Sequence, residues 1–300
     1  MKRRELFRIS TAMGLGAALP ALGLAATPAA SAGAPAAPLK PPAQGSIPVA
    51  FLLSDNAVVI DFGGPWEVFS NVSLPGRGDG PAFQLYTVAA TEAPITTTGG
   101  MKILPNYTIR NAPPPKVIVV PAQTVNDPAV LEWLRQASRS ADLTMSVCTG
   151  AFILAHAGLL DGKSAATYHG AFQDFAMSYP KVNLKRGARF VEEGNIATAG
   201  GLSSGIDLAL RVVERYFGRN IASATAYTLE YQGQGWLDPS SNSIYAKRRV
   251  STAEHPLCPI CDMDVAQGDP SSVYRERTYY FCCKDHKRLF DAHPENFSAV

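Results

Sequence analysis

The chain has 300 residues, of which 46% are hydrophobic and 17% charged, and this is the composition of an ordinary globular protein. The length allows one large domain together with a small one. A formal net charge of +2 is too small to indicate binding to nucleic acid or to an anionic membrane surface, so partners have to be inferred from individual sites.

The first 32 residues have the layout of a twin-arginine export signal. Arg3 and Arg4 are followed by Phe7, by a mild apolar run and by small residues at 30–32, where cleavage is expected. The apolar run is too short and too rich in glycine and alanine for a comfortable membrane span, so we expect no stable membrane insertion. An ordinary secretory signal or an uncleaved anchor is the alternative. The sequence therefore predicts a periplasmic or secreted protein.

The following residues predict one α/β domain. Residues 33–46 are rich in proline and alanine and are expected to form an extended linker. Apolar residues at helical spacing indicate helices at 126–140 and 203–218, and a hairpin is expected over 189–201. Short continuous apolar runs, typical of strands buried on both faces, lie at 47–53, 83–90, 116–121 and 142–148. This alternation predicts a flavodoxin-like three-layer α/β/α sandwich with a mostly parallel sheet over residues 47–238.

The segment "SVCTGAFILA" (146–155) places a lone thiol where a predicted strand meets a helix. Ligands of open parallel sheets bind at the carboxyl ends of strands, and a tight strand-turn-helix bend pushes the side chain of Cys148 outward, as in a nucleophile elbow. The helix that begins at Gly150 is expected to lower the pKa of the thiol, and its free amides are expected to hold a developing oxyanion. A buried, inert cysteine is the alternative.

Three segments together resemble the ThiJ/PfpI family of the class I glutamine amidotransferase-like superfamily. They are "SVCTGAFILAHAGLLDGKSAATYH" around Cys148, the acidic motif "IDFGGPWEVF" at 60–69, and the glycine-rich turn and helix at 197–218. The resemblance covers roughly residues 47–236. Within the family, Cys-Thr-Gly is typical of isonitrile hydratase-like members and of the amidase-like sensor domains of some AraC-type regulators.

By this resemblance, Asp61, Cys148 and Thr149 match the aspartate, cysteine and threonine that isonitrile hydratases use. The implied chemistry is attack of the thiolate on the isonitrile carbon to give a thioimidate. Asp61 would shuttle the proton and activate water, and Thr149 would orient water or substrate. Helix capping is the alternative for Asp61. We expect a small-molecule substrate, no cofactor at Cys148, and, because relatives are usually dimers, a possible homodimer.

Two departures from the family pattern affect the predicted site. Where relatives often carry Ala-Thr-Thr-His-Trp, this chain has "AATYHG", so His169 is a weaker catalytic candidate and a structural histidine is the alternative. Where relatives usually have Pro-Gly-Gly, this chain has "PAQ" at 121–123. An amide of residues 122–123 or the Gln123 side chain is expected to serve as oxyanion donor together with Gly150. The lost glycines put hydratase activity in question.

A cysteine-rich tail at 255–300 follows a polar linker at 239–254. With about 45 residues, the tail is too small to be stabilised by burial alone, so a metal or disulfides are expected. The spacing is that of a frequent zinc pattern, and the last two residues share one helical face: Cys258-x2-Cys261-x20-Cys282-x3-His286. Disulfides are the alternative, because the predicted compartment is oxidising.

The tail resembles the YHS domain, a small metal-binding module, in "CPICDM", "YYFCC" and "FDAHPENF". Asp262 replaces the usual glycine and His286 replaces the usual last cysteine, so the resemblance implies zinc or copper without deciding between them. Two functions follow from the sequence. One is an exported cysteine-dependent enzyme that hydrates or hydrolyses a small carbon–nitrogen substrate. The other is a non-catalytic periplasmic binding or stress protein that responds to metal or redox state.

Overall fold

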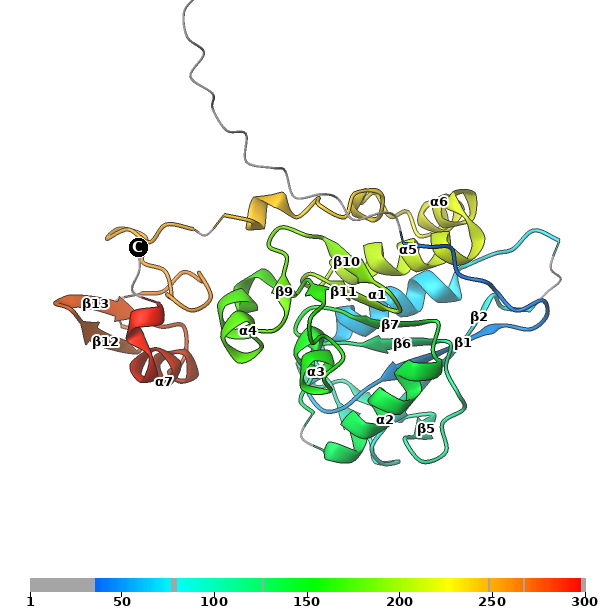
Figure 1. Ribbon diagram of the computed structural model, residues 1–300, viewed down its shortest axis with the longest axis horizontal. Coiled ribbons are helices and arrows are strands. Elements are labelled where there is room, and N and C mark those ends of the chain that lie inside the picture. The colour runs from blue at the N-terminus through cyan, green and yellow to red at the C-terminus, as the bar shows by residue number, and fades with distance from the viewer. Residues whose placement is uncertain (1–35, 77–79, 126, 248, 267, 298–300) are drawn as a thin grey trace, which may run out of the picture. The chain divides into compact units, whose positions relative to one another are not determined.

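The computed structural model describes residues 36–300 except 77–79, 126, 248, 267 and 298–300, so the predicted export signal lies outside the described residues. Its main sheet has seven strands in the order β10-β11-β7-β6-β1-β2-β5 (Figure 1). All neighbouring strands in this sheet are parallel except β10, which is antiparallel to β11. The strands are β1 (Ile47–Leu52), β2 (Phe83–Ala89), β5 (Tyr107–Thr108), β6 (Val117–Val120), β7 (Leu143–Ser146), β10 (Phe190–Glu193) and β11 (Ile196–Ala199).

Helices cover both faces of this sheet, as the sequence predicted. Because side chains alternate along a strand, Val117 and Val119 of β6 join one buried cluster, whereas Ile118 and Val120 join another. The first cluster contains side chains of α1 (Val59–Ser70), α5 (Ser204–Phe217) and α6 (Arg219–Thr228). The second contains side chains of α2 (Pro128–Ser140), α3 (Gly150–His156) and α4 (Phe172–Ser178). The α/β/α sandwich is therefore confirmed.

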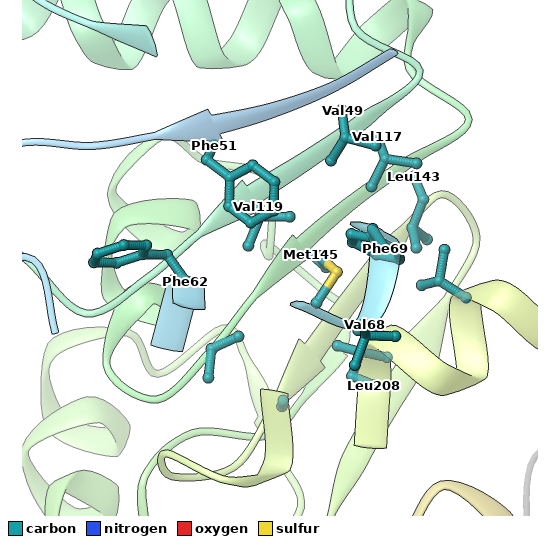
Figure 2. Packing of buried hydrophobic residues seen from close by; sticks show 14 of the residues in the cluster. Val49, Phe51, Phe62, Val68, Phe69, Val117, Val119, Leu143, Met145 and Leu208 are labelled. Carbon is teal, nitrogen blue, oxygen red and sulfur yellow. The ribbon is translucent and has the colours of Figure 1, made fainter. Parts of the chain in front are cut away.

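Figure 2 shows how α1 packs on the sheet, where Phe69 lies beside side chains of the central strands. Two aromatic contacts fix this helix: the Phe51 and Trp66 ring centroids are 4.9 Å apart, and those of Phe69 and Phe83 are 4.8 Å apart. Each buried phenyl ring contributes roughly 1.5–3 kcal/mol to the stability of the fold. This packing holds the first turn of α1, which carries Asp61, against the carboxyl ends of the central strands.

Local sequence explains two of the predicted elements. Asp127 caps α2 by accepting a hydrogen bond of 2.8 Å from the Ala129 amide, and Pro128 occupies the first turn, where no amide is needed. The predicted hairpin is formed by β10 and β11, and Gly194 takes the positive φ of 64° that its turn requires. Both predictions are confirmed.

The remaining elements are short. Two pairs lie outside the main sheet: β3 (Ile95–Thr96) with β4 (Lys102–Ile103), and β8 (Ser164–Ala165) with β9 (Asn183–Leu184). The tail contains the hairpin of β12 (Ser271–Tyr274) and β13 (Arg277–Tyr280), followed by α7 (Lys284–Ala292). Single 3-10 turns occur at Thr98–Gly100, His169–Ala171, Gly235–Leu237, Ser243–Tyr245 and Pro294–Asn296. In the described part of the chain, every helix is too short or too polar to cross a membrane.

The tail has a small apolar core of its own. Phe281 and Phe290 are fully buried, with ring centroids 5.1 Å apart, and the Phe290 ring also contacts Tyr279. The buried sulfurs of Cys258 and Cys261 belong to the same cluster. Because so few apolar side chains are present, the thiols form a large part of what the tail buries.

The turn between β7 and α3 requires glycine at position 150. A Cβ atom there would lie 2.2 Å from the carbonyl oxygen of Val120 and 2.9 Å from that of Pro121. Both obstacles are backbone atoms of the neighbouring strand segment, so neither can move aside easily. The Gly150 amide donates to the Val147 carbonyl at 3.0 Å, which closes the turn. Gly150 is therefore needed for close backbone packing.

We expect Gly150→Ala to lower the free energy of unfolding by about 1–3 kcal/mol or more, because the added methyl group overpacks a rigid contact. Gly63→Ala is the matched control, since Gly63 lies inside α1 with open space around its Cα. Alanine there should be neutral or stabilising by about 0.5–1 kcal/mol. Urea unfolding of both variants measures the difference, and equal effects would show that the elbow tolerates a side chain.

Candidate active site and metal group

Cys148 is held at the end of β7 in a backbone conformation that non-glycine residues rarely adopt. Its φ is 60°, in the left-handed region. Two hydrogen bonds fix it: the Cys148 amide donates to the Gly200 carbonyl at 2.9 Å, and the Thr167 hydroxyl donates to the Cys148 carbonyl at 2.9 Å. The residue is 7% exposed. The predicted strand-turn-helix elbow is therefore present. Its backbone is held by hydrogen bonds with Gly200, which follows β11, and with Thr167, which follows β8.

Asp61 is fully buried in the first turn of α1 and faces the same thiol. Its Oδ2 accepts a hydrogen bond of 3.1 Å from the Ala122 amide. Its Oδ1 has no full hydrogen bond among the described residues, and the Cys148 side chain is the polar group that interacts with the carboxyl. The side chain does not cap α1, whose first residue is Val59. The structure thus brings together Asp61 and Cys148, as the sequence predicted.

Burial decides the protonation of this pair. It raises the pKa of Asp61 to about 6, against the opposing effects of the Ala122 amide and the thiol. Burial, together with the nearby Asp61 carboxylate, raises the pKa of Cys148 to about 12. The expected lowering of the thiol pKa by the following helix is therefore wrong, because α3 has only seven residues and desolvation outweighs its effect. At neutral pH the pair is a thiol beside a carboxylate.

Three donors stabilise negative charge on the Cys148 sulfur. They are the amide and hydroxyl of Thr149 and the amide of Leu202, each of which lowers the pKa of the thiol in opposition to burial. Thr149 lies directly before α3, so its position at the sulfur follows from the elbow. This agrees with the predicted placement of Thr149 in the site.

The other predicted oxyanion donors make different contacts. The Gln123 side chain accepts a hydrogen bond of 2.6 Å from the Ser54 amide and donates one of 2.8 Å to the Leu52 carbonyl. The Ala122 amide serves Asp61, and the Gly150 amide closes its own turn. Gln123 therefore links the ends of β1 and β6, and the donors at the sulfur are those of Thr149 and Leu202.

Leu202 and Thr167 were not among the predicted site residues. Leu202 follows Gly200 and Gly201 after β11, has a positive φ of 46°, and is 44% exposed. Because β11 lies next to β7 in the sheet, the turn after β11 necessarily meets the elbow. The pair of glycines directly after a strand was the sequence signal for this turn. It could point to the Cys148 site only once the order of the strands in the sheet was known.

His169 lies in a cavity beside the site. Its ring stacks on Tyr245 with centroids 4.3 Å apart at 13°, and its other ring contact is with Tyr168 at 4.4 Å. Burial lowers the pKa of His169. Within the described residues, no hydrogen bond joins it to Cys148. His169 and Tyr168 both line a cavity of about 130 Å³, so His169 forms part of the cavity wall.

The tail brings its four predicted ligands together. The ligand atoms of Cys258, Cys261, Cys282 and His286 all lie within 4.8 Å of one another and form a group that could hold a metal ion. Cys261 and Cys282 sulfurs are 3.5 Å apart, and the Cys282 sulfur is 3.2 Å from His286 Nδ1. Ligand atoms of a tetrahedral zinc site lie roughly 3.3–3.8 Å apart, whereas a disulfide requires about 2.05 Å. The spacing therefore favours metal ligation.

Local backbone geometry supports this arrangement. Asp262 has a φ of 59°, which explains why the resembling module has glycine at this position. The Cys258 amide donates to the Met263 carbonyl at 2.9 Å and so folds the first pair of ligands into one loop. Hydrogen bonds with Cys261 and His286 hold the pKa of the Cys258 thiol well below its usual range. All five cysteines of the described chain are free, and Cys283 is exposed outside the group.

A parallel α/β sandwich with a cysteine on the strand-helix elbow and a buried acid beside it defines a class of cysteine-centred α/β proteins. The chain belongs to the DJ-1/PfpI family, whose family model matches residues 48–215. The crystal structure of a ThiJ/PfpI family protein from Pseudomonas syringae has a TM-score of 0.56 and 25% sequence identity, and the match covers 63% of this chain and 77% of that one.

Two relatives show how differently this fold is used. The chain is 31% identical to the isonitrile hydratase of Pseudomonas putida over 219 residues, which are 71% of this chain and 91% of that enzyme. It is 28% identical to the HTH-type transcriptional regulator CdhR of Pseudomonas aeruginosa over 145 residues, which are 47% of this chain and 43% of the regulator. The second match therefore spans less than half of that regulator.

We expect Asp61→Asn to change the pH dependence of stability. The pKa of Asp61 is about 6 in the folded state, above the ordinary value of 3.8. The neutral carboxyl therefore contributes fully to the free energy of unfolding below pH 3.8, and this contribution is lost as the pH rises through 6. The variant should avoid this loss and gain on the order of 2–3 kcal/mol relative to wild type between pH 4 and 7.5. Asp161→Asn, at an exposed ion pair, is the control. Urea unfolding measures the free energy of unfolding of wild type and Asp61→Asn at each pH. If the two free energies changed with pH in the same way, the raised pKa of Asp61 would be contradicted.

We expect the purified full chain to retain one metal ion per chain after dialysis and Cys261→Ser to weaken its retention at least about tenfold, because the variant loses a ligand. Cys283→Ser is the matched control, since this neighbouring thiol is exposed and outside the group. Elemental mass spectrometry measures the metal content. Equal loss from both variants, or full retention by Cys261→Ser, would show that the four residues do not form the site.

Proposed function

We propose that this chain is an exported, cysteine-dependent enzyme that hydrates small isonitriles to N-substituted formamides. The observation that carries the proposal is the buried Asp61 carboxyl beside the thiol of Cys148 on the elbow. The similarity to isonitrile hydratase over 91% of that enzyme supports the same chemistry.

In the first step, Asp61 accepts the thiol proton as the Cys148 sulfur attacks the terminal carbon of the isonitrile. Asp61 then delivers this proton to the same carbon, which gives the thioimidate R–N=CH–S–Cys. The carboxylate is the form that can accept the proton, so the pKa of about 6 suits it to work at neutral pH. The high pKa of the thiol means that proton transfer and attack have to be coupled.

In the second step, Asp61 removes a proton from water as the water oxygen adds to the thioimidate carbon, and Asp61 then delivers this proton to the nitrogen. The resulting tetrahedral intermediate, R–NH–CH(OH)–S–Cys, expels the sulfur, and the hydroxyl proton returns to the pair through Asp61. The products are R–NH–CHO and the free thiol, so the whole reaction consumes one water. The amides of Thr149 and Leu202 stabilise the departing thiolate.

Export and metal binding are the two remaining parts of the proposal. Arg3, Arg4 and Phe7 support export through the twin-arginine route, which carries folded proteins. The four-residue group of the tail supports a YHS-like domain with zinc or copper as a structural ion. Folding before export would let the tail acquire its metal inside the cell.

The alternative is a non-catalytic binding or stress protein that responds to metal or redox state. The specific observation in its favour is that Ala122 and Gln123, which replace the family glycines, are both engaged in contacts away from the sulfur. In this case the tail would be the functional site, and Cys148 would serve as a buried packing residue.

The deciding experiment is turnover of a panel of small isonitriles by the full chain, with formamide measured by mass spectrometry. We expect Cys148→Ser and Asp61→Asn each to lower kcat/KM by about 10²–10⁴-fold. Activity of the wild type should rise with pH around pH 6, as Asp61 ionises. Asp161→Asn, on the surface, should be unchanged. Undiminished turnover by Cys148→Ser would remove the proposed nucleophile, and retention of metal without any turnover would favour the alternative.

A further inference from the structure

The turn that follows β11 makes two of the contacts that hold Cys148. We call residues 200–203 the β11 turn. The Gly200 carbonyl accepts a hydrogen bond of 2.9 Å from the Cys148 amide, and the Leu202 amide stabilises negative charge on the Cys148 sulfur. Leu202 itself has a positive φ of 46° and is 44% exposed. An exposed residue in the left-handed region persists only where its surroundings hold it, so the β11 turn needs support from other segments.

A continuous chain of backbone hydrogen bonds leads from Cys148 through the β11 turn to Arg189. The Cys148 amide donates to the Gly200 carbonyl, and the Gly200 amide donates to the Arg189 carbonyl at 2.9 Å. The Arg189 amide in turn donates to the carbonyl of Pro239, a residue of the predicted linker, at 2.6 Å. The backbone of Arg189 is thus bonded on both sides, so its side chain starts from a fixed position.

The Arg189 guanidinium joins three segments of the chain. Its Nε donates to Oδ2 of Asp207 in α5 at 2.6 Å, its Nη2 to the hydroxyl of Ser203 in the β11 turn at 3.1 Å, and its Nη1 to Oδ1 of Asn242 at 3.1 Å. An arginine presents its donors in a rigid planar fork, so these contacts fix the three segments relative to one another. A lysine, with a single nitrogen, could not join all three.

Asp207 holds the guanidinium in this position. The Asp207 side chain is fully buried, and that of Arg189 is 16% exposed. The Tyr231 hydroxyl donates to the same carboxylate oxygen at 3.0 Å. A Cβ atom at Gly235 would lie 2.8 Å from Arg189 Nε, so this segment packs directly against the ion pair. A buried carboxylate is costly without its cation, so the guanidinium stays beside the β11 turn.

We propose that Arg189 is a positioning residue of the Cys148 site. Its guanidinium holds Ser203 and thereby places the neighbouring Leu202 amide at the sulfur. Within the described residues, the hydrogen bonds of the guanidinium go to other partners than Cys148 and Asp61, so Arg189 acts through the β11 turn. For turnover, the proposal rests on the hydratase function given above. For the reactivity of the thiol, it rests on these contacts alone.

The first test measures how fast iodoacetamide alkylates Cys148 in the full chain, by peptide mass spectrometry between pH 7 and 10. The variant combines Arg189→Met with Asp207→Asn, so that no unpaired charge is left in the interior. Only the thiolate reacts, and loss of one amide that stabilises it should lower the rate about tenfold at each pH. A rate that is unchanged or raised in this variant would overturn the proposal. So would a wild-type thiol that fails to react at pH 10.

The matched control for this test is Arg211→Met. The Arg211 side chain is 15% exposed and pairs with Glu192 and Glu214, so its loss removes an ion pair of comparable burial. These partners lie on β10 and α5, outside the β11 turn. The alkylation rate of Cys148 should therefore be unchanged. Equal slowing in both variants would indicate a general loosening of the fold and would overturn the specific role of Arg189.

The second test separates catalysis from binding in isonitrile hydration by the full chain. Ser203→Ala removes the hydroxyl that accepts from Arg189 and should lower kcat at least about threefold with KM unchanged, because the β11 turn acts on the sulfur during the reaction. Ser203→Thr keeps the hydroxyl and should restore kcat. A change in KM alone, or equal kcat values for the two variants, would overturn the proposal. If no isonitrile is turned over, the hydratase function fails, and the alkylation test still decides the role of Arg189.

Discussion

A single proton shared between two buried groups governs the chemistry proposed for this molecule. Asp61 and Cys148 are both removed from water, and the Asp61 carboxylate makes ionisation of the Cys148 thiol more costly. Burial raises the pKa of both groups, so the proton rests on the sulfur at neutral pH and the charge rests on the carboxyl. In the proposed reaction, the isonitrile carbon that the sulfur attacks also accepts the proton, so the thiol never has to ionise by itself. The protonation of the pair therefore supports the proposed chemistry.

The sheet brings these groups together through the order of its strands. The chain leaves the adjacent strands β1, β6, β7 and β11 at the same edge, because all four are parallel. The segment after β6 provides the Ala122 amide for Asp61, the turn after β7 provides Cys148, and the turn after β11 provides the Leu202 amide. Each group is separated from the others by many residues in the sequence. The parallel register alone makes them neighbours.

This dependence on strand order explains how far the sequence could predict the molecule. Apolar runs and helical spacing predicted the sandwich. The polar cap at Asp127 predicted the start of α2, and Gly194 predicted the turn of the β10–β11 hairpin. Asp61 could be predicted from one family motif, and Cys148 and Thr149 from another. Leu202 could not, since its role depends on the adjacency of β11 and β7. The direction of the thiol pKa was also missed, because burial is a property of the packed fold and outweighed the local effect of a short helix.

Burial of the thiol also bears on where such a protein can work. Oxidation of cysteine proceeds through the thiolate, and burial raises the pKa of Cys148 so far that the neutral thiol dominates at neutral pH. The Cys148 thiol is thereby protected in the oxidising compartment proposed for the chain. The thiols of the tail would be protected differently, by a bound metal that occupies their lone pairs. The exposed Cys283 has neither protection, so oxidants should reach it before the other four cysteines.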